Sequence, residues 1–427
     1  MLVAGIEGLA QVAKGVKFYR DLFGQDPLGM WPGEGSVAEE VVAAFVQNGV
    51  QWIATDQEVL AKSLSSAPAC YQCYPYRVDA DKVSGDGGTQ NDEMAMVFRD
   101  TGLSNKVGFN FQGMYGQVAA QEFLKDVAAM APSFGGGDRL VTVVLDGENA
   151  WESYTKEHDA KGFHQALYKA LQDGFRVGEL VPVTVAEYIQ GNPARNVPAH
   201  PIHALQELEP LWAGSWIGGT YSTWIGEAEE NLAWDYLRRA RQTLAQNLPN
   251  PPNPAANPPA DSNSAAYWIY QAYEEMYAAE GSDWFWWYGD DMTSPSNDDT
   301  PFDMAFRSHL NGMYAAMNEA LTRLGKTPVA IPDLAPIIQA QPKAPSGPFG
   351  TPPSIDGLLL PNESEWTSEG GLFFDNDSGA MSNPNDIVSE VYYGYTSTSF
   401  YCALATNDPL SQRQGTPFML ELYFSQK

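Results

Sequence analysis

The chain has 427 residues, a length that predicts two or three domains because domains usually hold roughly 100–200 residues. Hydrophobic residues make up 44% of the sequence, so the chain can build a core and disorder throughout is excluded. The sequence has 24 Lys and Arg against 53 Asp and Glu, a formal net charge of −29, which makes it a poor general binder of nucleic acid or anionic lipid.

Other features of the composition narrow the partners and the compartment. No apolar run approaches the ~20 residues of a membrane span, and residues 1–10 lack a basic leader, so we expect no membrane partner and, by default, a cytoplasmic protein. The lone CxxC of Cys70 and Cys73 supplies too few ligands for structural zinc, so we expect no metal and no cofactor. Aromatic residues reach 12%, which suits stacking on sugar rings. Oligomeric state is left open.

Residues 1–190 predict an α/β domain in which helices and strands alternate. Helices are expected over 12–23, 37–47, 117–130 and 163–173, and strands over 28–31, 51–54, 106–111 and 140–145. The second helix is expected to open with a capping box of Ser36 and Glu39 and to end at Gly49. Such alternation implies parallel strands, and chemistry in parallel sheets gathers at the carboxyl ends of the strands.

The remaining chain predicts two further parts. Residues 191–330 read as a helical domain, with helices over 227–246, 265–279 and 300–324 and an exposed Pro- and Asn-rich insertion at 247–263. Residues 331–427 begin with a Pro-rich linker and continue with strand-like runs at 388–393, 399–404 and 418–424, typical of the start of a β-sandwich. The expected domains are therefore 1–190, 191–330 and 331–427.

The first candidate motif is Trp31-Pro32-Gly33-Glu34-Gly35-Ser36-Val37. Its carboxylate lies between two glycines, after a predicted strand and before a predicted helix. The small neighbours leave Glu34 accessible, and nearby backbone N–H groups favour its ionised form. An acid that merely supports the dipole of the helix is the alternative interpretation.

The second candidate motif begins at the end of the predicted strand at 140–145 and reads Val144-Leu145-Asp146-Gly147-Glu148-Asn149-Ala150-Trp151-Glu152. The strand presents Asp146 at its carboxyl end. Packing against a ring such as Trp151 can raise a carboxyl pKa, as a general acid requires. A polar turn in which Asp146 caps a helix is the alternative interpretation.

The third candidate motif spans residues 279–291, where five aromatic residues in a row are flanked by acids. Five consecutive rings cannot all face one helical core, so some are expected to face a cleft; an aromatic plug between domains is the alternative. Two carboxylates on separate strands of one sheet, with tryptophans around them, are the layout that cleavage of a glycosidic bond needs.

At these motifs the sequence resembles glycoside hydrolase family 57, and most of all its amylopullulanase-like members, from about Val12 to Leu324. Residues 29–37 resemble the family's nucleophile motif, 145–149 its acid/base motif and 282–291 its last motif. Shorter likenesses occur at 98–100, 103–104, 108–109, 214–217 and 224–226. The resemblance implies an α/β fold comprising the C-terminal part of a (β/α)7 barrel, then an α-helical domain that completes the cleft and the start of a β-sandwich.

The resemblance also implies retaining cleavage of α-glucans such as starch or glycogen, at α-1,4 and also α-1,6 bonds, with Glu34 as nucleophile and Asp146 as acid/base. The substrate is an α-glucan polysaccharide or oligosaccharide, without a cofactor. Further substrate contacts are expected from Trp31, Arg99, Asp100, Glu148, Trp151, Trp216, Trp224, Asp283, Trp284, Trp287 and Asp290.

The sequence departs from the family in three places. The two motifs that precede the nucleophile motif are not found before Glu34, so about half of the barrel is expected to be missing, leaving strands four to seven. Met292 and Glu227 stand where members often carry His. Two other functions stay open: transfer to a sugar hydroxyl, as in a 4-α-glucanotransferase or branching enzyme, and a truncated, inactive carbohydrate-binding remnant.

Overall fold

The computed structural model describes residues 6–67, 70–79, 93–130, 138–147, 151, 153–157, 159–294, 298–338, 347–355, 364–367, 370–374 and 388–406. The chain forms two compact units. The first contains Met1–Tyr288 and Met304–Ala335, and the second contains Gly289–Asp303 and Pro336–Lys427.

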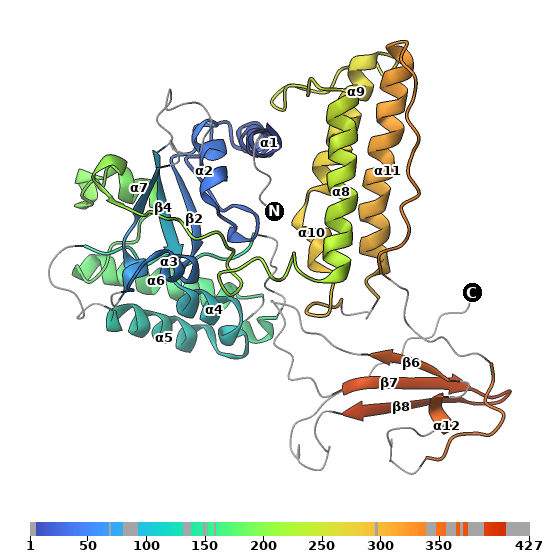
Figure 1. Ribbon diagram of the computed structural model, residues 1–427. Helices are drawn as coiled ribbons and strands as arrows, with labels where there is room; N and C mark the ends of the chain where they lie inside the picture. The colour runs from blue at the N-terminus through green and yellow to red at the C-terminus, as the bar shows by residue number, and fades with distance from the viewer. Residues whose placement is uncertain are drawn as a thin grey trace. The chain divides into compact units, whose positions relative to one another are not determined.

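A five-stranded sheet in the order β1-β2-β4-β3-β5 lies at the centre of one part of the first unit (Figure 1). Its strands are β1 (Gly29–Met30), β2 (Trp52–Asp56), β3 (Tyr76–Asp79), β4 (Glu93–Arg99) and β5 (Gln206–Glu207). The neighbours β1, β2 and β4 run parallel, whereas β3 is antiparallel to β4 and parallel to β5. This sheet with its parallel strands confirms the α/β class, because parallel pairing needs crossover helices between the strands.

The two faces of the sheet are buried by different elements, as alternation along β4 requires. Met94, Met96 and Phe98 belong to one core cluster together with the apolar face of helix α2 (Glu39–Val46). Val97, whose side chain points to the opposite face of the sheet, belongs to a second cluster that contains Leu140. Arg99 has the same parity as Val97, so it extends from the face opposite α2.

Helices form at all four predicted positions around this sheet, although the first begins six residues earlier than predicted, and three further helices here were not predicted. The helices are α1 (Ile6–Phe23), α2, α3 (Gln57–Ser63), α4 (Thr101–Gly108), α5 (Gly116–Ala129), α6 (Lys161–Val177) and α7 (Val185–Gln190). Short 3-10 turns lie at Gly33–Gly35, Tyr71–Cys73, Asn110–Gly113, Thr155–Glu157, Pro193–Arg195 and Ile202–Ala204. Helices α5 and α6 pack closely, because a Cβ at Gly116 would lie 2.4 Å from the backbone N of Phe163.

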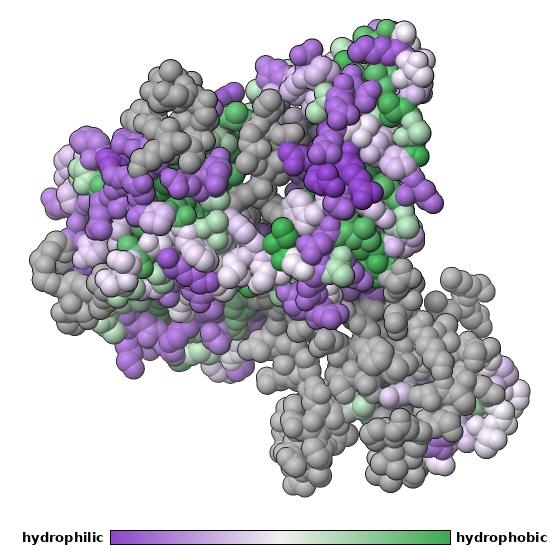
Figure 2. Space-filling model, viewed as in Figure 1, coloured by the Kyte–Doolittle hydropathy of each residue, from purple (hydrophilic) through white to green (hydrophobic). Residues whose placement is uncertain are grey.

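The other part of the first unit is helical. It contains α8 (Ala228–Asn247), α9 (Ala265–Ala279), the short α10 (Ser282–Trp286) and α11 (Thr300–Arg323), which begins in the second unit. A capping box of Glu227 and Glu230 opens α8, and Ser264 caps α9. In Figure 2 the visible surface over the middle of α8 is hydrophilic. The polar side chains of α8 include Asp235, which forms an ion pair with Arg238.

The second unit holds a three-stranded antiparallel sheet in the order β6-β7-β8. The strands are β6 (Gly371–Phe374), β7 (Val388–Tyr395) and β8 (Phe400–Thr406), and a short helix, α12 (Ser364–Thr367), precedes them. The predicted strand at 418–424 lies outside the described residues. Whether this sheet opens a β-sandwich stays a prediction.

Three of the local predictions are wrong. Residues 106–111 are not a strand, because Asp100 accepts a hydrogen bond from Leu103 N (2.8 Å) and thereby starts α4. Ser36 does not cap α2: it is extended and buried, and α2 begins after Ala38. The run 140–145 is not a regular strand, although Thr142 forms a parallel bridge with Arg99 at the end of β4.

Candidate active site

Glu34 lies in the 3-10 turn that connects β1 to α2, in a backbone conformation that few side chains adopt. Its φ and ψ are 58° and 24°, in the left-handed region, which costs a non-glycine residue roughly 1–2 kcal/mol. The turn is held by Thr55, whose Oγ1 donates to Gly35 O (2.6 Å), and by the ring of Trp31, which packs where Gly35 has no Cβ. The fold therefore keeps Glu34 in a strained position.

Two side chains from distant segments donate to the carboxylate of Glu34. Trp216 Nε1 donates to Oε2 at 3.0 Å, and Ser282 Oγ, at the start of α10, donates to Oε1 at 3.3 Å. Trp216 N also donates to the backbone O of Glu34 at 3.1 Å. Because donors favour the ionised carboxylate, these contacts suit a nucleophile.

Arg99, at the carboxyl end of β4, is the buried cation of the site. Only 3% of Arg99 is exposed, and its guanidinium donates to Asp56 Oδ2 (3.1 Å), Asn105 Oδ1 (2.7 Å) and Val144 O (3.1 Å). Its Cζ lies 5.0 Å from the centre of the Trp216 ring. One guanidinium thus contacts both the ring that binds Glu34 and the segment that leads to Asp146.

Asp56, directly across from Arg99 in the β2–β4 register, is fully buried. Burial raises the pKa of Asp56, while hydrogen bonds from Glu58 N and Thr101 Oγ1 and the charge of Arg99 oppose this shift. The carboxylate also caps α3 through Glu58 N. Asp56 therefore fixes Arg99 and contacts the beginning of the next helix at the same time.

Asp146 follows the segment 140–145, which runs beside the end of β4. Asp100 N donates to Thr142 O (2.9 Å), and Ser104 Oγ accepts from Val144 N (3.2 Å). Asp146 is half-buried, two residues beyond the carbonyl that Arg99 binds. Because this segment pairs in parallel with β4, Asp146 and Glu34 lie at the same edge of the sheet.

Asp100, Trp151 and Glu148 are also predicted to contact substrate, and the structure describes the surroundings of the first two. Asp100 accepts from Leu103 N and from Gln72 Nε2 (3.0 Å), so its carboxylate serves the fold. Trp151 packs edge-on to His164, with ring centres 4.5 Å apart, and burial lowers the pKa of this histidine. Glu148 lies outside the described residues.

Trp224 and the aromatic residues at 284–288 differ in their burial: some lie in the core and others are partly exposed. Trp224 is 1% exposed, so neither face of its ring is open to a sugar, and the prediction of a platform there fails on burial. Phe285 and Tyr288 are fully buried against α11, whereas Trp284 and Trp287 are half-buried. Asp283 in the first unit and Asp290 in the second unit are both exposed.

Sequence reasoning missed three residues that hold this arrangement. Asp56 was visible only as a polar residue at a strand end, Ser282 as part of the aromatic motif, and Asn105 carried no signal. Each contributes a hydrogen bond to Glu34 or Arg99. A contact of this kind depends on which segments meet in space, which local patterns do not reveal.

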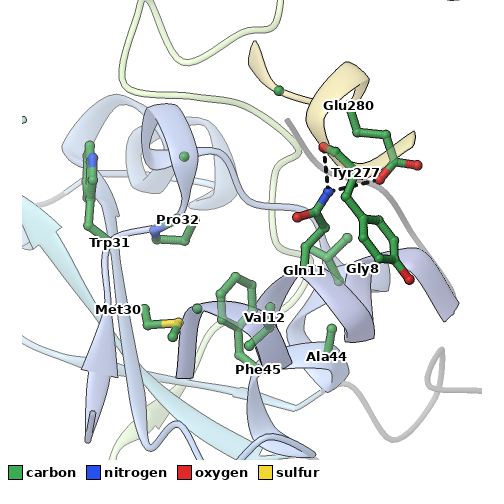
Figure 3. A pocket seen from close by; sticks show the side chains of 14 residues that line it. Gly8, Gln11, Val12, Met30, Trp31, Pro32, Ala44, Phe45, Tyr277 and Glu280 are labelled. Atoms are coloured by element: carbon green, nitrogen blue, oxygen red, sulfur yellow. Dashed lines mark hydrogen bonds between the residues drawn. The ribbon is translucent and has the colours of Figure 1, made fainter. Parts of the chain in front are cut away.

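A pocket of about 270 Å³ adjoins the turn that carries Glu34 (Figure 3). Its lining includes Gly8, Gln11, Val12, Met30, Trp31, Gly33, Phe45, Tyr277, Glu280 and Gly281. The side-chain amide of Gln11 donates to Tyr277 O and to Glu280 Oε2, both at 3.0 Å. These bonds join α1 to the end of α9, and so they help to place Ser282 beside Glu34.

Among the described residues, no three His, Cys, Asp or Glu side chains are grouped to hold a metal ion. Cys70 and Cys73 form a disulfide, which a lone CxxC did not lead us to expect. None of the helices in the described part of the chain is long and apolar enough to cross a membrane.

The profile of glycosyl hydrolase family 57 matches residues 6–202. A sequence comparison with curated proteins gave no match. Several solved structures share the fold, among them two branching enzymes and an α-amylase. The GH57-type branching enzyme from Pyrococcus horikoshii aligns with a TM-score of 0.53 at 16% identity, over 79% of this chain and 72% of that one.

The other two structures are somewhat longer relative to this chain. TK1436, a GH57 branching enzyme from Thermococcus kodakaraensis crystallised with glucose, gives a TM-score of 0.51 at 13% identity, over 75% of this chain and 63% of that one. The α-amylase AmyC from Thermotoga maritima gives 0.51 at 14% identity, over 74% and 64%. The chain thus spans less than two thirds of these two proteins, and identities this low bear on the fold alone.

Proposed function

Because residues 6–202 belong to glycosyl hydrolase family 57, whose members act on α-glucans, we propose that this chain is a retaining α-glucan glycosidase with Glu34 as nucleophile and Asp146 as acid/base. We further propose that β1, β2, β4 and the segment at Thr142 are strands four to seven of a (β/α)7 barrel. The proposed domains are 1–190, 191–330 and 331–427, and amylopullulanase-like cleavage of starch or glycogen is the proposed specificity.

The observation that carries the proposal is the setting of the Glu34 carboxylate. Trp216 and Ser282, which lie 182 and 248 residues further along the chain, both donate to it. A carboxylate that only supported a helix dipole would need neither donor. The strained backbone of Glu34 points the same way, because such strain is concentrated at functional sites.

The proposed reaction has two displacements. Glu34 attacks C1 of the glucosyl unit while Asp146 protonates the departing O4 or O6, which gives a β-linked glycosyl-enzyme and a free chain end. Asp146 then takes a proton from water, whose oxygen attacks C1 and releases Glu34. This course requires carboxyl groups about 5–5.5 Å apart, and the proposal expects that separation between Glu34 and Asp146.

Among the aromatic candidates, Trp284 and Trp287 are proposed as sugar platforms and Asp283 as a hydroxyl acceptor. These side chains are at least partly open, as contact with a polysaccharide requires. Trp224 is not retained because of its burial, and Asp100 is assigned to the cap of α4.

Azide rescue tests the two assignments separately. With an activated α-glucosyl substrate, Glu34→Gly plus azide is expected to give the β-glucosyl azide, because azide replaces the missing nucleophile in a single inversion. Asp146→Ala plus azide is expected to give the α-product, because azide then attacks the β-linked glycosyl-enzyme. Unchanged hydrolysis by Glu34→Gly, or the same anomer from both variants, would contradict the proposal.

Transfer to a sugar hydroxyl is the second candidate, favoured by the similarity in fold to two branching enzymes. Products longer than the maltooligosaccharide substrate, or new α-1,6 branches, would identify transfer. A third possibility is an inactive carbohydrate-binding remnant. Binding of α-glucan without turnover by the wild-type chain would support that alternative.

A further inference from the structure

We propose that Trp216 is a positioning residue for Glu34, locked in place by Arg99, and not a platform on which sugar stacks. This inference rests on the proposed function of Glu34 as nucleophile. In the same proposal, Arg99 keeps the segments that carry Glu34 and Asp146 aligned with one another. It does not contact substrate hydroxyls.

Trp216 donates hydrogen bonds to both the side chain and the backbone of Glu34. Its indole N–H donates to Oε2, and its backbone N–H donates to the Glu34 carbonyl. The segment around Trp216 is itself fixed to the nucleophile turn, because Val37 and Gly214 form an antiparallel bridge with two hydrogen bonds of 2.9 and 3.0 Å. Gly214 also closes a tight turn, since a Cβ there would lie 2.5 Å from Gly219 O.

Arg99 lies over one face of the Trp216 ring. All three guanidinium nitrogens have partners in Asp56, Asn105 and Val144, so the guanidinium is fixed in orientation. A sugar that stacked on this face of Trp216 would have to compete with the buried cation, whose Cζ is 5.0 Å from the ring centre. A cation near an indole ring draws electron density from it, which strengthens the N–H as a donor to Glu34.

The arrangement suggests which oxygen of Glu34 reacts. Oε2 is bound at 3.0 Å by the rigid indole, whereas Oε1 contacts the small hydroxyl of Ser282 at 3.3 Å. A hydroxyl can rotate away as a bond to C1 forms, but an indole packed between segments cannot. We therefore assign Oε1 as the attacking oxygen and Oε2 as the oxygen held in place.

Trp216→Phe is the test, because it keeps a ring for stacking and removes the N–H. Loss of one charge-assisted hydrogen bond is expected to lower kcat by about 10- to 100-fold with little change in KM. The acidic limb of the kcat/KM profile is expected to move to higher pH, since the ionised carboxylate loses a donor. A higher KM with unchanged kcat and pH profile would instead indicate a sugar platform and overturn the proposal.

Trp212→Phe is the matched control. Trp212 lies four residues earlier and has Lys62 Nζ 5.7 Å from its ring centre, but it donates its indole N–H to Gly219 O at 2.9 Å and not to Glu34. Its replacement is expected to leave kcat and the pH profile unchanged. Arg99→Lys, which keeps the charge and loses the planar fork, is expected to lower kcat as Trp216→Phe does.

A readout independent of turnover separates this inference from the proposed function. The carboxyl carbon of Glu34 can be followed by ¹³C NMR, assigned by its disappearance in Glu34→Gln. Titration of this signal at higher pH in Trp216→Phe than in wild type is expected whether or not the enzyme turns over α-glucan. An unchanged titration would refute the role of Trp216, whereas a wild-type chain without turnover would refute only the proposed function.

Discussion

The strained backbone of Glu34 makes a prediction that separates stability from catalysis. At φ 58° and ψ 24°, any side chain beyond hydrogen carries a cost of roughly 1–2 kcal/mol. Glycine avoids this cost but gains roughly 0.4–1 kcal/mol of entropy in the unfolded chain. The difference leaves Glu34→Gly more stable than Glu34→Ala by about 1 kcal/mol.

Alanine is the appropriate reference for Glu34→Gly. Both variants lose the hydrogen bonds from Trp216 and Ser282, so those terms cancel and the backbone term remains. Urea unfolding of the two variants measures this difference in the free energy of unfolding directly. Both are expected to be inactive, so the more stable variant gains nothing in function, as expected where strain is held at a catalytic position.

Asn196 provides the calibration within the same chain. It is exposed, has φ 57° and ψ 34°, and lies far in sequence from the site. The pair Asn196→Ala and Asn196→Gly is expected to differ by the same amount, about 1 kcal/mol, with activity retained in both. If the Asn196 pair differs in this way and the Glu34 pair does not, the backbone of Glu34 is not strained and the reasoning fails.

Three further predictions concern the surroundings of the site. Asp56→Asn leaves Arg99 buried without its counter-charge, so urea unfolding should show a loss of about 3–5 kcal/mol; a loss below about 1 kcal/mol would contradict the buried pair. Gly116→Ala places a methyl group 2.4 Å from Phe163 N and should cost about 1–3 kcal/mol; unchanged thermal unfolding would show that α5 and α6 are not so close. Because burial lowers the pKa of His164, the folded state favours the neutral ring, so stability is expected to fall as the pH drops below about 6.5; His164→Phe should flatten this dependence, and an equally steep loss in the variant would assign it to other groups.

The two candidate carboxylates could be proposed from sequence because each has a local signal, although each signal also allowed a purely structural interpretation. Glu34 lies between glycines after a strand, and Asp146 ends an apolar run. Their partners could not be predicted, since Trp216 and Ser282 reach Glu34 only through the folding of segments far apart in the chain. A hydrogen bond across such a separation leaves no periodicity in either segment.

The strand wrongly predicted at 106–111 and strand β4, which was not predicted, have different physical origins. Residues 94–98 form a continuous apolar run, as a strand buried on both faces does, and such a run shows no alternation. The apolar residues at 107–111 instead follow a cap, and the side chain of Asp100 decides for a helix there. A single capping hydrogen bond thus outweighs weak β propensity, which a short window cannot resolve.

The buried pair of Asp56 and Arg99 matters because it fixes the orientation of the guanidinium, and not because it stabilises the fold. Burying two charges is costly, and well-packed apolar residues often replace such a pair without loss of stability. A pair of leucines, however, would offer no donor to Val144 O and no cation for the ring of Trp216. What the pair adds is a guanidinium fixed in one plane, with one edge toward the segment of Asp146 and its cationic carbon near the residue that holds Glu34. Since the proposed mechanism sets the separation of the two carboxylates, a rigid group that contacts both the segment of Asp146 and the residue that binds Glu34 is the element that such a site requires.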